Sequence, residues 1–536
     1  MSGVGKGIAS SSIAKILQAK GFQVTALKIA PYINVDAGTM NPTEHGEVFV
    51  LDDGDETDQD MGNYERFLDV DLSRINYMTT GRVYEEVIRK ERNLEYKGKN
   101  VEVVPDVPLE VIARIEKAAN KARADITVIE IGGTVGEYQN IIFLEAGRML
   151  KSKYQGDVAF VMVSYLPVPS KIGEMKTKPT QYASRTLNSA GVQGDIIIAR
   201  SEAPLDQKRK EKIAIFCNIS ADRVVSAPDV NSIYDVPINF EKDRLGEKLL
   251  QVLNLPSKRK TNFKEWFKFV KKTRNGKKTV NIAVVGKYFD SGSFVLSDVY
   301  ISVLEAIKFS AYACNVKPKL TYINSKDIES KKVKVTEFAG YDGLLVPGGF
   351  GQAGVEGIIT AIRYARERKI PFFGLCYGMQ LAVIEFSRHV CGWRDAQTTE
   401  IDKNTKHPVI DVMPEQKTHL AEGKFGATMR LGACTAILKK GSVAERAYGA
   451  QKISERHRHR FEVNPEYIAL LEGKGMVFSG KSPDGRLCEI AELPSRVHPF
   501  FLGTQFHPEF KASPLHPHPL FTAFIKAAIK NGKTRK

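Results

Sequence analysis

Cysteine is scarce in this sequence, and no two cysteines are arranged as metal ligands. The six cysteines stand singly among 536 residues, without a CxxC pair or a short Cys/His spacing. This usage argues against a cysteine-ligated metal site or a disulfide framework and is typical of a reducing compartment. Apolar runs as long as a membrane span and a signal-peptide pattern are also missing. We therefore expect a cytoplasmic protein that does not partner a membrane.

Acidic residues are scarce in the two stretches that carry most of the net charge of +16. Residues 257–278 hold ten Lys or Arg against the single acid Glu265, and residues 526–536 hold five and no acid. The rest of the chain is therefore close to neutral. Such runs are usually solvated segments, and no stacking-aromatic or groove-helix motif accompanies them. A nucleic-acid partner is not expected.

Apolar, β-like runs alternate with amphipathic segments on both sides of the basic stretch 257–278. This alternation predicts an α/β fold with two doubly wound, mainly parallel-sheet domains. The runs lie at 22–29, 126–133, 158–166, 195–201, 223–230, 280–288, 317–325, 341–351 and 370–380. We place the domains at 1–256 and 280–530, with a linker at 257–279 and a basic tail at 531–536. Within the linker, Phe263, Trp266, Phe267 and Val270 follow helical spacing and predict a short docked helix.

The second domain carries a candidate nucleophile. In "GLCYGMQ", Cys376 stands between an apolar strand and a helical run, where a sharp turn exposes a thiol and a helix N-terminus lowers its pKa. A single cysteine is more often a small buried hydrophobe. However, "GTQFHPEF" supplies His507 and Glu509, which would share one face of an extended segment. "VPGGFG" (346–351) supplies glycines whose N–H groups could hold an oxyanion.

These three motifs, in this order, resemble class I glutamine amidotransferases. The resemblance implies a flavodoxin-like domain in which Cys376 is the nucleophile, His507 the base and Glu509 its orienting partner. It also implies a glutamine-binding set, in which Glu400 holds the ammonium and Arg460 the carboxylate. The set comprises Gly349, Tyr377, Gly378, Met379, Gln380, Glu400 and Arg460.

The first residues, "MSGVGKGIASSS", look like a phosphate-binding loop that opens a helix, although no strand precedes them. Further along, Glu130 lies near the end of an apolar strand, and Asp60 lies in a segment rich in acids. The two carboxylates suit Mg²⁺, although any one acid here is more often part of the solvated surface. Lys176 and Lys178 lie on a loop that spacing alone does not distinguish from an ordinary basic loop.

The motifs "APYINVDAGTMNPTEHGEVFV", "DMGNYERF", "IEIGGTVG", "KTKPTQ" and "VNSIYDVP" together resemble CTP synthases. The resemblance implies a P-loop-like synthetase domain in which ATP phosphorylates O4 of UTP and ammonia from glutamine displaces the phosphate. It implies Mg²⁺ as cofactor, GTP as allosteric activator, and self-association into homodimers, homotetramers and filaments.

The resemblance also assigns sites residue by residue. ATP would contact Gly3, Val4, Gly5, Lys6, Gly7, Ile8, Lys28 and Asp60. UTP would contact Ser2, Lys176, Thr177, Lys178, Pro179, Thr180, Gln181 and Lys212. Asp60 and Glu130 would bind Mg²⁺, His45 would line the ammonia passage, and Arg430 in "ATMRLG" would take part in GTP activation. Glu137, Tyr138 and Gln139 replace an acidic triplet of the family at the site of CTP feedback.

Two alternatives stay open at this point. Another ATP-dependent amidase would share the second domain, although it would lack "APYINVDAGTM" and "KTKPTQ". The second hypothesis is a filament-forming or regulatory paralogue with impaired synthesis, which is a non-catalytic role. The presence of all the expected catalytic residues argues against it. Family members begin with a strand and a "GGV"-type turn that this sequence lacks, so we expect Met1 to be an internal methionine. A chain that truly began there would bind ATP weakly.

Overall fold

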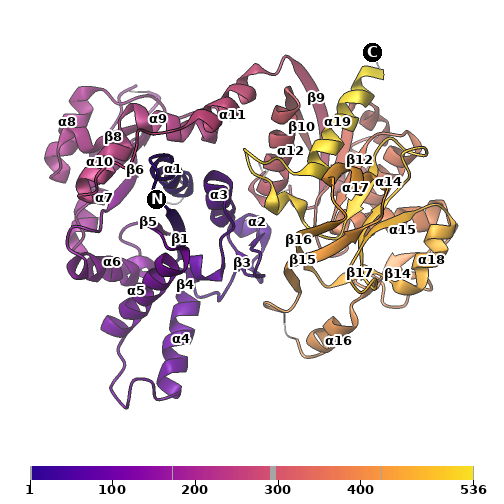
Figure 1. The fold of residues 1–536 in the computed structure, drawn as a ribbon, viewed down its shortest axis with the longest axis horizontal. Helices are drawn as coiled ribbons and strands as arrows, with labels where there is room; N and C mark the ends of the chain where they lie inside the picture. Colours follow the sequence, from indigo (N-terminus) through magenta and orange to yellow (C-terminus); the bar gives the residue numbers. More distant parts are fainter. Residues whose placement is uncertain (1–2, 172, 290–296, 424, 535–536) are drawn as a thin grey trace. The chain divides into compact units, whose positions relative to one another are not determined.

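The computed structural model describes residues 3–171, 173–289, 297–423 and 425–534 (Figure 1). Two compact units make up the chain: unit 1 is Met1–Asp36 with Asn63–Trp266, and unit 2 is Ala37–Gly62 with Phe267–Lys536. The predicted first domain is thus not a single unit, because residues 37–62 belong with the C-terminal half. The boundary at 266/267 lies inside the predicted linker.

Unit 1 contains two parallel sheets, each of three strands, in the described chain. Their orders are β4-β1-β5 and β6-β7-β8. Parallel strands need crossover helices, which bury both faces of the sheet and favour apolar runs. The strands are β1 (Val24–Ala30), β4 (Tyr77–Thr79), β5 (Ile126–Ile131), β6 (Val161–Tyr165), β7 (Ile196–Ser201) and β8 (Val224–Pro228). The helices are α1 (Lys6–Ala19), α4 (Thr80–Arg92), α5 (Val103–Ala122), α6 (Ile141–Lys153), α7 (Lys178–Ser189), α8 (Gln207–Cys217), α9 (Val236–Lys242) and α10 (Leu245–Val252).

Unit 2 is built on a mixed sheet with the order β10-β9-β11-β12-β20-β19-β18-β15-β16 in the described residues. The strands from β10 to β20 pair in parallel, and those from β20 to β16 pair antiparallel. The predicted α/β class is therefore correct, and the parallel pairing is confined to one half of this sheet. The strands are β9 (Lys278–Gly286), β10 (Val316–Asn324), β11 (Gly343–Val346), β12 (Phe372–Leu375), β15 (Arg430–Leu438), β16 (Lys452–His459), β18 (Val477–Lys481), β19 (Cys488–Glu492) and β20 (Phe501–Thr504).

Smaller elements complete unit 2. Two minor sheets are formed by β2 with β3 and by β13, β14 and β17. Their bounds are β2 (Phe49–Val50), β3 (Glu56–Thr57), β13 (Gln397–Thr398), β14 (Pro408–Val412) and β17 (Phe461–Val463). The helices are α2 (Pro42–His45), α12 (Ile301–Ala313), α13 (Ser325–Glu329), α14 (Val355–Glu367), α15 (Tyr377–His389), α16 (Pro414–Ala421), α17 (Val443–Tyr448), α18 (Pro465–Gly473) and α19 (Pro519–Thr534).

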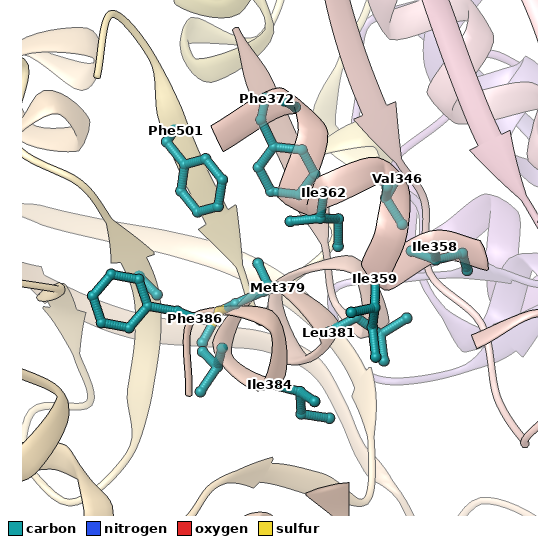
Figure 2. Packing of buried hydrophobic residues seen from close by; sticks show 14 of the residues in the cluster. Val346, Ile358, Ile359, Ile362, Phe372, Met379, Leu381, Ile384, Phe386 and Phe501 are labelled. Carbon is teal, nitrogen blue, oxygen red and sulfur yellow. The ribbon is translucent and has the colours of Figure 1, made fainter. Parts of the chain in front are cut away.

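The core of unit 2 lies between its sheet and the helices α14 and α15 (Figure 2). Phe372 of β12 and Phe501 of β20 are register partners whose ring centroids lie 4.7 Å apart. Met379 of α15 is fully buried in the same cluster. This packing holds the end of β12 and the start of α15 against each other, and the predicted nucleophile lies at that junction.

All nine predicted strand runs contain a strand, and the predicted linker helix is α11 (Lys264–Asn275). Trp266 and Val270 are buried as expected, with exposures of 1% and 4%, but Phe267 is 52% exposed. Phe269 is buried in its place. The helix begins in unit 1 and continues in unit 2, so one amphipathic stripe does not describe its whole length. The helix α3 (Gln59–Leu68) likewise contains the boundary at 62/63.

Candidate active site

Cys376 lies on a strained turn between β12 and α15. Its φ of 48° is in the left-handed region, which is uncommon for a residue with a side chain and is typical of a nucleophile elbow. Glycines on both sides allow this turn: a Cβ on Gly374 would lie 2.7 Å from the carbonyl carbon of Gly378. A Cβ on Gly378 would lie 2.4 Å from the carbonyl oxygen of Val346. The backbone packs too closely at Gly374 and Gly378 for any residue with a Cβ atom.

The predicted base and its partner form a buried pair. His507 Nδ1 lies 2.8 Å from Glu509 Oε1. Burial opposes a charge on the imidazole, but Glu509 and the Cys376 sulfur outweigh it and raise the pKa of His507 to about 10. The predicted extended segment is wrong in detail, because Pro508–Lys511 forms a 3₁₀ turn. The carboxylate still reaches the imidazole within this tighter turn.

These side chains share one cavity. Its wall includes Cys376, His507 and Glu509 together with glycines of the 346–351 motif. The full lining is Pro42, Glu47, Val48, Tyr288, Val299, Tyr300, Val303, Gly348, Gly349, Phe350, Cys376, Arg458, His507, Glu509 and Phe510. A Cβ on Gly348 would lie 2.8 Å from His507 Cε1, so this position must stay a glycine for the imidazole to fit. The wall thus combines a thiol, a paired imidazole and a glycine loop.

The glycine loop Gly348–Gly351 has the features of an oxyanion site. In the described residues, the N–H groups of Gly349 and Tyr377 have no hydrogen-bond acceptor. Tyr377 is the first residue of α15, where a backbone N–H has no partner within the helix. The N–H of Gly351 donates to Glu400 Oε1 at 2.7 Å. Two N–H groups near the nucleophile are thus available to a developing negative charge.

The predicted glutamine-binding residues are only partly brought together. Gly349 lines the cavity, whereas Arg460 does not; its guanidinium donates to Gln416 Oε1 at 2.6 Å and to the carbonyl of Phe425 at 2.5 Å. Met379 lies in the apolar core (Figure 2). Gln380 donates to the carbonyl of Phe461 at 2.7 Å. Burial raises the pKa of Glu400, whose carboxylate holds the loop at Gly351.

Arg458, two residues before Arg460, is the arginine on the cavity wall. Its carbonyl oxygen lies 3.7 Å from Cys376 Sγ, and Gln505 Nε2 lies 3.6 Å from the same sulfur. On a strand, alternate residues share a face, and Arg456 and Arg458 both contact the segment 37–62. The run "RHRHR" alternates arginine and histidine, but the sequence alone does not predict which arginine lines the cavity.

The segment 37–62 supplies part of the cavity wall, which sequence reasoning missed. Pro42, Glu47 and Val48 line the cavity, and Glu47 accepts hydrogen bonds from the backbone N–H and the hydroxyl of Ser302 at the start of α12. His45 is exposed beside this wall, at the end of α2.

Ion pairs whose arginines are buried hold the segment 37–62 in unit 2. Arg458 Nε lies 2.8 Å from Glu56 Oε1, with side-chain exposures of 11% and 1%. Arg456 pairs with Asp52, which also lies 3.2 Å from Lys511 Nζ. A buried charge is tolerated only when it is paired and hydrogen-bonded, so these pairs explain why the segment groups with the C-terminal half.

Arg430 lies in a buried polar cluster. Its guanidinium donates to Glu489 Oε1 at 2.7 Å and lies 3.8 Å from Glu462 Oε2. Burial lowers the pKa values of His457 and His459 and raises the pKa of Glu462 to about 8. The Arg430 side chain is 15% exposed, so its charge is directed into unit 2.

The glycine stretch at the start of unit 1 leads into α1. Gly3 and Gly5 have φ values of 70° and 86°, and α1 begins at Lys6. These left-handed conformations suit glycine and direct N-terminal N–H groups of the helix toward one point, as an anion site requires. Val4 and Gly7 are buried, and Lys6 and Ile8 are partly exposed. The predicted Ser2 lies outside the described residues.

Lys28 and Glu130 form a buried ion pair on neighbouring parallel strands. Lys28 of β1 and Glu130 of β5 are register partners, and their charged atoms lie 2.7 Å apart. Tyr64 also donates to the Glu130 carboxylate. Both side chains lie toward the carboxyl ends of their strands, where α/β sheets hold their ligands. The predicted ATP lysine and the predicted metal carboxylate are thus neighbours.

The predicted magnesium ligands are carboxylates, which are the donors that this ion prefers. Glu130 belongs to unit 1 and Asp60 to unit 2. Throughout the described ranges, no group of three or more His, Cys, Asp or Glu side chains is arranged to hold a metal. Mg²⁺ commonly takes one or two protein carboxylates and completes its shell with phosphate oxygens and water. The donor chemistry therefore fits the ion.

The predicted UTP loop leads into α7. Lys176 pairs with Glu174 at 2.6 Å, and Lys178 lies 5.1 Å from the ring centroid of Phe216 on α8. Thr177 caps α7 and accepts from Gln181 Nε2 at 3.1 Å. The remaining members are Pro179, which is exposed, Thr180, which contacts Ser164, and Lys212, which is exposed on α8.

The predicted feedback residues lie on a short turn after β5. Glu137 accepts from the N–H of Thr134 and from Gln139 Nε2, each at 3.0 Å. Tyr138 is 93% exposed. A large aromatic side chain in this position is available to a ligand or partner.

Two family models match the chain. "CTP synthase N-terminus" covers residues 1–255, and "Glutamine amidotransferase class-I" covers residues 295–527. The CTP synthase of Thermococcus gammatolerans is 48% identical over 530 residues, which are 98% of this chain and 97% of that protein. The chain belongs to the CTP synthase family. The CTP synthase of Methanocaldococcus jannaschii is 47% identical over 99% of this chain and 97% of that protein.

Membership of the CTP synthase family makes the chain a glutamine-hydrolysing ligase, and the second family match places its amidotransferase domain in unit 2. A solved structure described as "Trypanosoma brucei CTPS - glutaminase domain with bound acivicin" is 38% identical, with a TM-score of 0.42, over 47% of this chain and 94% of that chain. Within the described ranges, no helix is long and apolar enough to cross a membrane.

Proposed function

We propose that this chain converts UTP to CTP with ATP, using ammonia from glutamine. The observation that carries the proposal is the grouping of Cys376, His507 and Glu509 around one cavity. His507, positively charged at neutral pH, stabilises the thiolate of Cys376, which attacks the side-chain amide carbon of glutamine. The imidazolium then gives its proton to the departing ammonia, and the backbone N–H groups of Gly349 and Tyr377 hold the oxyanion.

The resulting thioester is hydrolysed by water, with His507 as general base. The ammonia passes to the synthetase unit. There ATP phosphorylates O4 of UTP, and ammonia displaces that phosphate at C4. The poor leaving group of UTP thereby becomes a good one, which explains why ATP is consumed.

In unit 1, α1 and Lys28 are the groups that suit the phosphates of ATP, because both offer positive charge to a transferring phosphoryl group. Asp60 and Glu130 would hold Mg²⁺, which neutralises phosphate charge when bound. The loop 176–181 and Lys212 would hold UTP. Activation by GTP, feedback by CTP at 137–139 and assembly into homotetramers are further parts of this proposal.

The test is CTP formation by the full chain from UTP, ATP and Mg²⁺, with glutamine or with ammonia. We expect both nitrogen sources to work, and Cys376→Ala to abolish only the glutamine-dependent reaction. Hydrolysis of glutamine without CTP formation from either source would refute the synthase proposal and leave an amidotransferase with another acceptor.

A further inference from the structure

The oxyanion loop Gly348–Gly351 is held at two successive peptide groups. The N–H of Phe350 donates to the hydroxyl of Tyr288 at 3.0 Å, and the N–H of Gly351 donates to Glu400 at 2.7 Å. The carbonyl of Gly351 accepts from the hydroxyl of Tyr377 at 2.7 Å. Side chains from separate parts of unit 2 thus converge on one short loop.

Lys287, which directly follows β9, contacts this loop at Gly349 and at Gly351. A Cβ on Gly349 would lie 3.3 Å from Lys287 Cδ, so the stem of the lysine packs directly against that glycine. Its ammonium donates to the carbonyl of Gly351. The same ammonium lies 4.8 Å from the ring centroid of Tyr377, the residue that follows the nucleophile. Lys287 therefore contacts both sources of the proposed oxyanion N–H groups.

Burial of this ammonium is costly. Lys287 is 9% exposed, and a buried amine normally requires a partner that repays its lost hydration. Its ammonium donates to a carbonyl and lies near an aromatic ring, while the carboxylates of Glu400 and Glu329 stabilise its charge from further away. An apolar side chain of similar length would fill the same space without the free-energy cost of removing an ammonium from water. The choice of lysine is thus better explained by the position it imposes on the loop than by stability.

We propose that Lys287 is a positioning residue that fixes the oxyanion loop Gly348–Gly351 against Tyr377 for hydrolysis of glutamine. The inference rests on the proposed glutaminase chemistry at Cys376. Among the described residues, Lys287 is not part of the cavity wall around Cys376; it acts by holding the Gly349 and Tyr377 N–H groups at a fixed separation. A displaced donor weakens the transition state more than it weakens substrate binding.

The charge on Lys287 responds to several neighbours. Burial lowers its pKa to about 8; Glu400 and Glu329 oppose this change, and Lys326 adds to it. The hydroxyl of Tyr377 shares its acceptor. Below about pH 8 the ammonium is charged and holds Gly351, whereas above it the neutral amine binds the carbonyl less strongly. Turnover should therefore have an alkaline limb near pH 8, below the pKa of about 10 of His507.

The experiment compares Lys287→Met with the unmodified full chain in steady-state glutamine hydrolysis, with ATP and UTP present. We expect kcat to fall about 10- to 100-fold, the effect of losing one charge-assisted contact. KM for glutamine should stay within about twofold, and the alkaline limb near pH 8 should disappear. Lys287→Arg, which keeps its charge at all these pH values, should retain more activity and move the limb upward.

Alkylation of Cys376 by iodoacetamide separates positioning from a general structural role. The thiol and His507 are unchanged in Lys287→Met, so the alkylation rate should stay within about twofold. Lys308→Met, a lysine of α12 paired with Glu305 at 2.7 Å, is the matched control and should leave kcat unchanged. The proposal is overturned by a kcat within twofold of the parent, by an unchanged alkaline limb, or by a parallel loss of alkylation. A parent chain that does not hydrolyse glutamine would instead refute the proposed function itself, and this role with it.

Discussion

Replacing Glu509 by Gln tests the electrostatic basis of the catalytic pair. The substitution keeps the shape of the side chain and an oxygen that can accept from His507 Nδ1, but it removes the charge. In the parent protein, the pKa of His507 is raised from 6.5 to about 10 although burial opposes it. That rise corresponds to roughly 5 kcal/mol in favour of the imidazolium, and Glu509 is the largest of the groups that supply it.

Without Glu509, burial remains and the His507 pKa should fall, so the imidazole is neutral over more of the pH range. The thiolate of Cys376 then loses its cationic partner. A hydrogen bond to a charged group contributes about 1.5–3 kcal/mol, so we expect glutamine hydrolysis to fall about 10- to 100-fold at pH 7.5. The sign follows from the raised pKa: the imidazolium is present below about pH 10 in the parent and is lost at lower pH in the variant.

The assay is the alkylation rate of Cys376 as a function of pH, followed by mass spectrometry of the peptide that contains it, because five other free cysteines are present. In Glu509→Gln, the curve of alkylation rate against pH should move to higher pH. Glu466→Gln, an exposed carboxylate of α18, is the matched control and should behave as the parent. Equal rates and equal pH profiles for the parent and Glu509→Gln would refute the assignment of the pair.

Three further predictions concern the rest of the chain. Glu56→Gln leaves the Arg458 guanidinium buried without its carboxylate and should cost about 3–5 kcal/mol of unfolding free energy, measured by chemical denaturation; a loss below about 1 kcal/mol would contradict the pairing. Glu130→Ala removes the carboxylate that pairs with Lys28 and should reduce ammonia-dependent CTP formation at least tenfold, while glutamine hydrolysis persists; equal loss of both activities would contradict the assignment of the two reactions to separate sites. Phe372→Ala empties the core beside α15 (Figure 2) and should cost about 3–5 kcal/mol, seen as a lower calorimetric Tm of unit 2, whereas an unchanged Tm would refute the packing.

Several parts of the fold were predictable because they depend on short-range patterns. The nine strand runs are recognisable from apolar residues bounded by turn residues, and each contains a strand. The glycines around Cys376 predict a sharp turn, because only glycine tolerates the close backbone approach found at Gly374 and Gly378. The spacing of His507 and Glu509 put them within reach, although the backbone between them is a 3₁₀ turn rather than extended.

Other features depend on contacts between distant residues. The grouping of 37–62 with the C-terminal half follows from pairs such as Arg458 with Glu56, which are about 400 positions apart. The choice of Arg458 over Arg460 for the cavity wall depends on where β16 ends, because Arg458 lies within the strand and Arg460 follows it. No local pattern carries that information.

The sequence by itself determined the α/β class, the strands, the nucleophile elbow and the chemistry of the thiol, imidazole and carboxylate. These follow from periodicity, turn chemistry and residue type, which act over a few neighbouring positions. Only the tertiary structure decided which side chains surround Cys376, and that Lys287 lies beneath the glycine loop. The physical reason is that buried charges are placed by partners far away in the chain, and such partners are set by packing rather than by spacing.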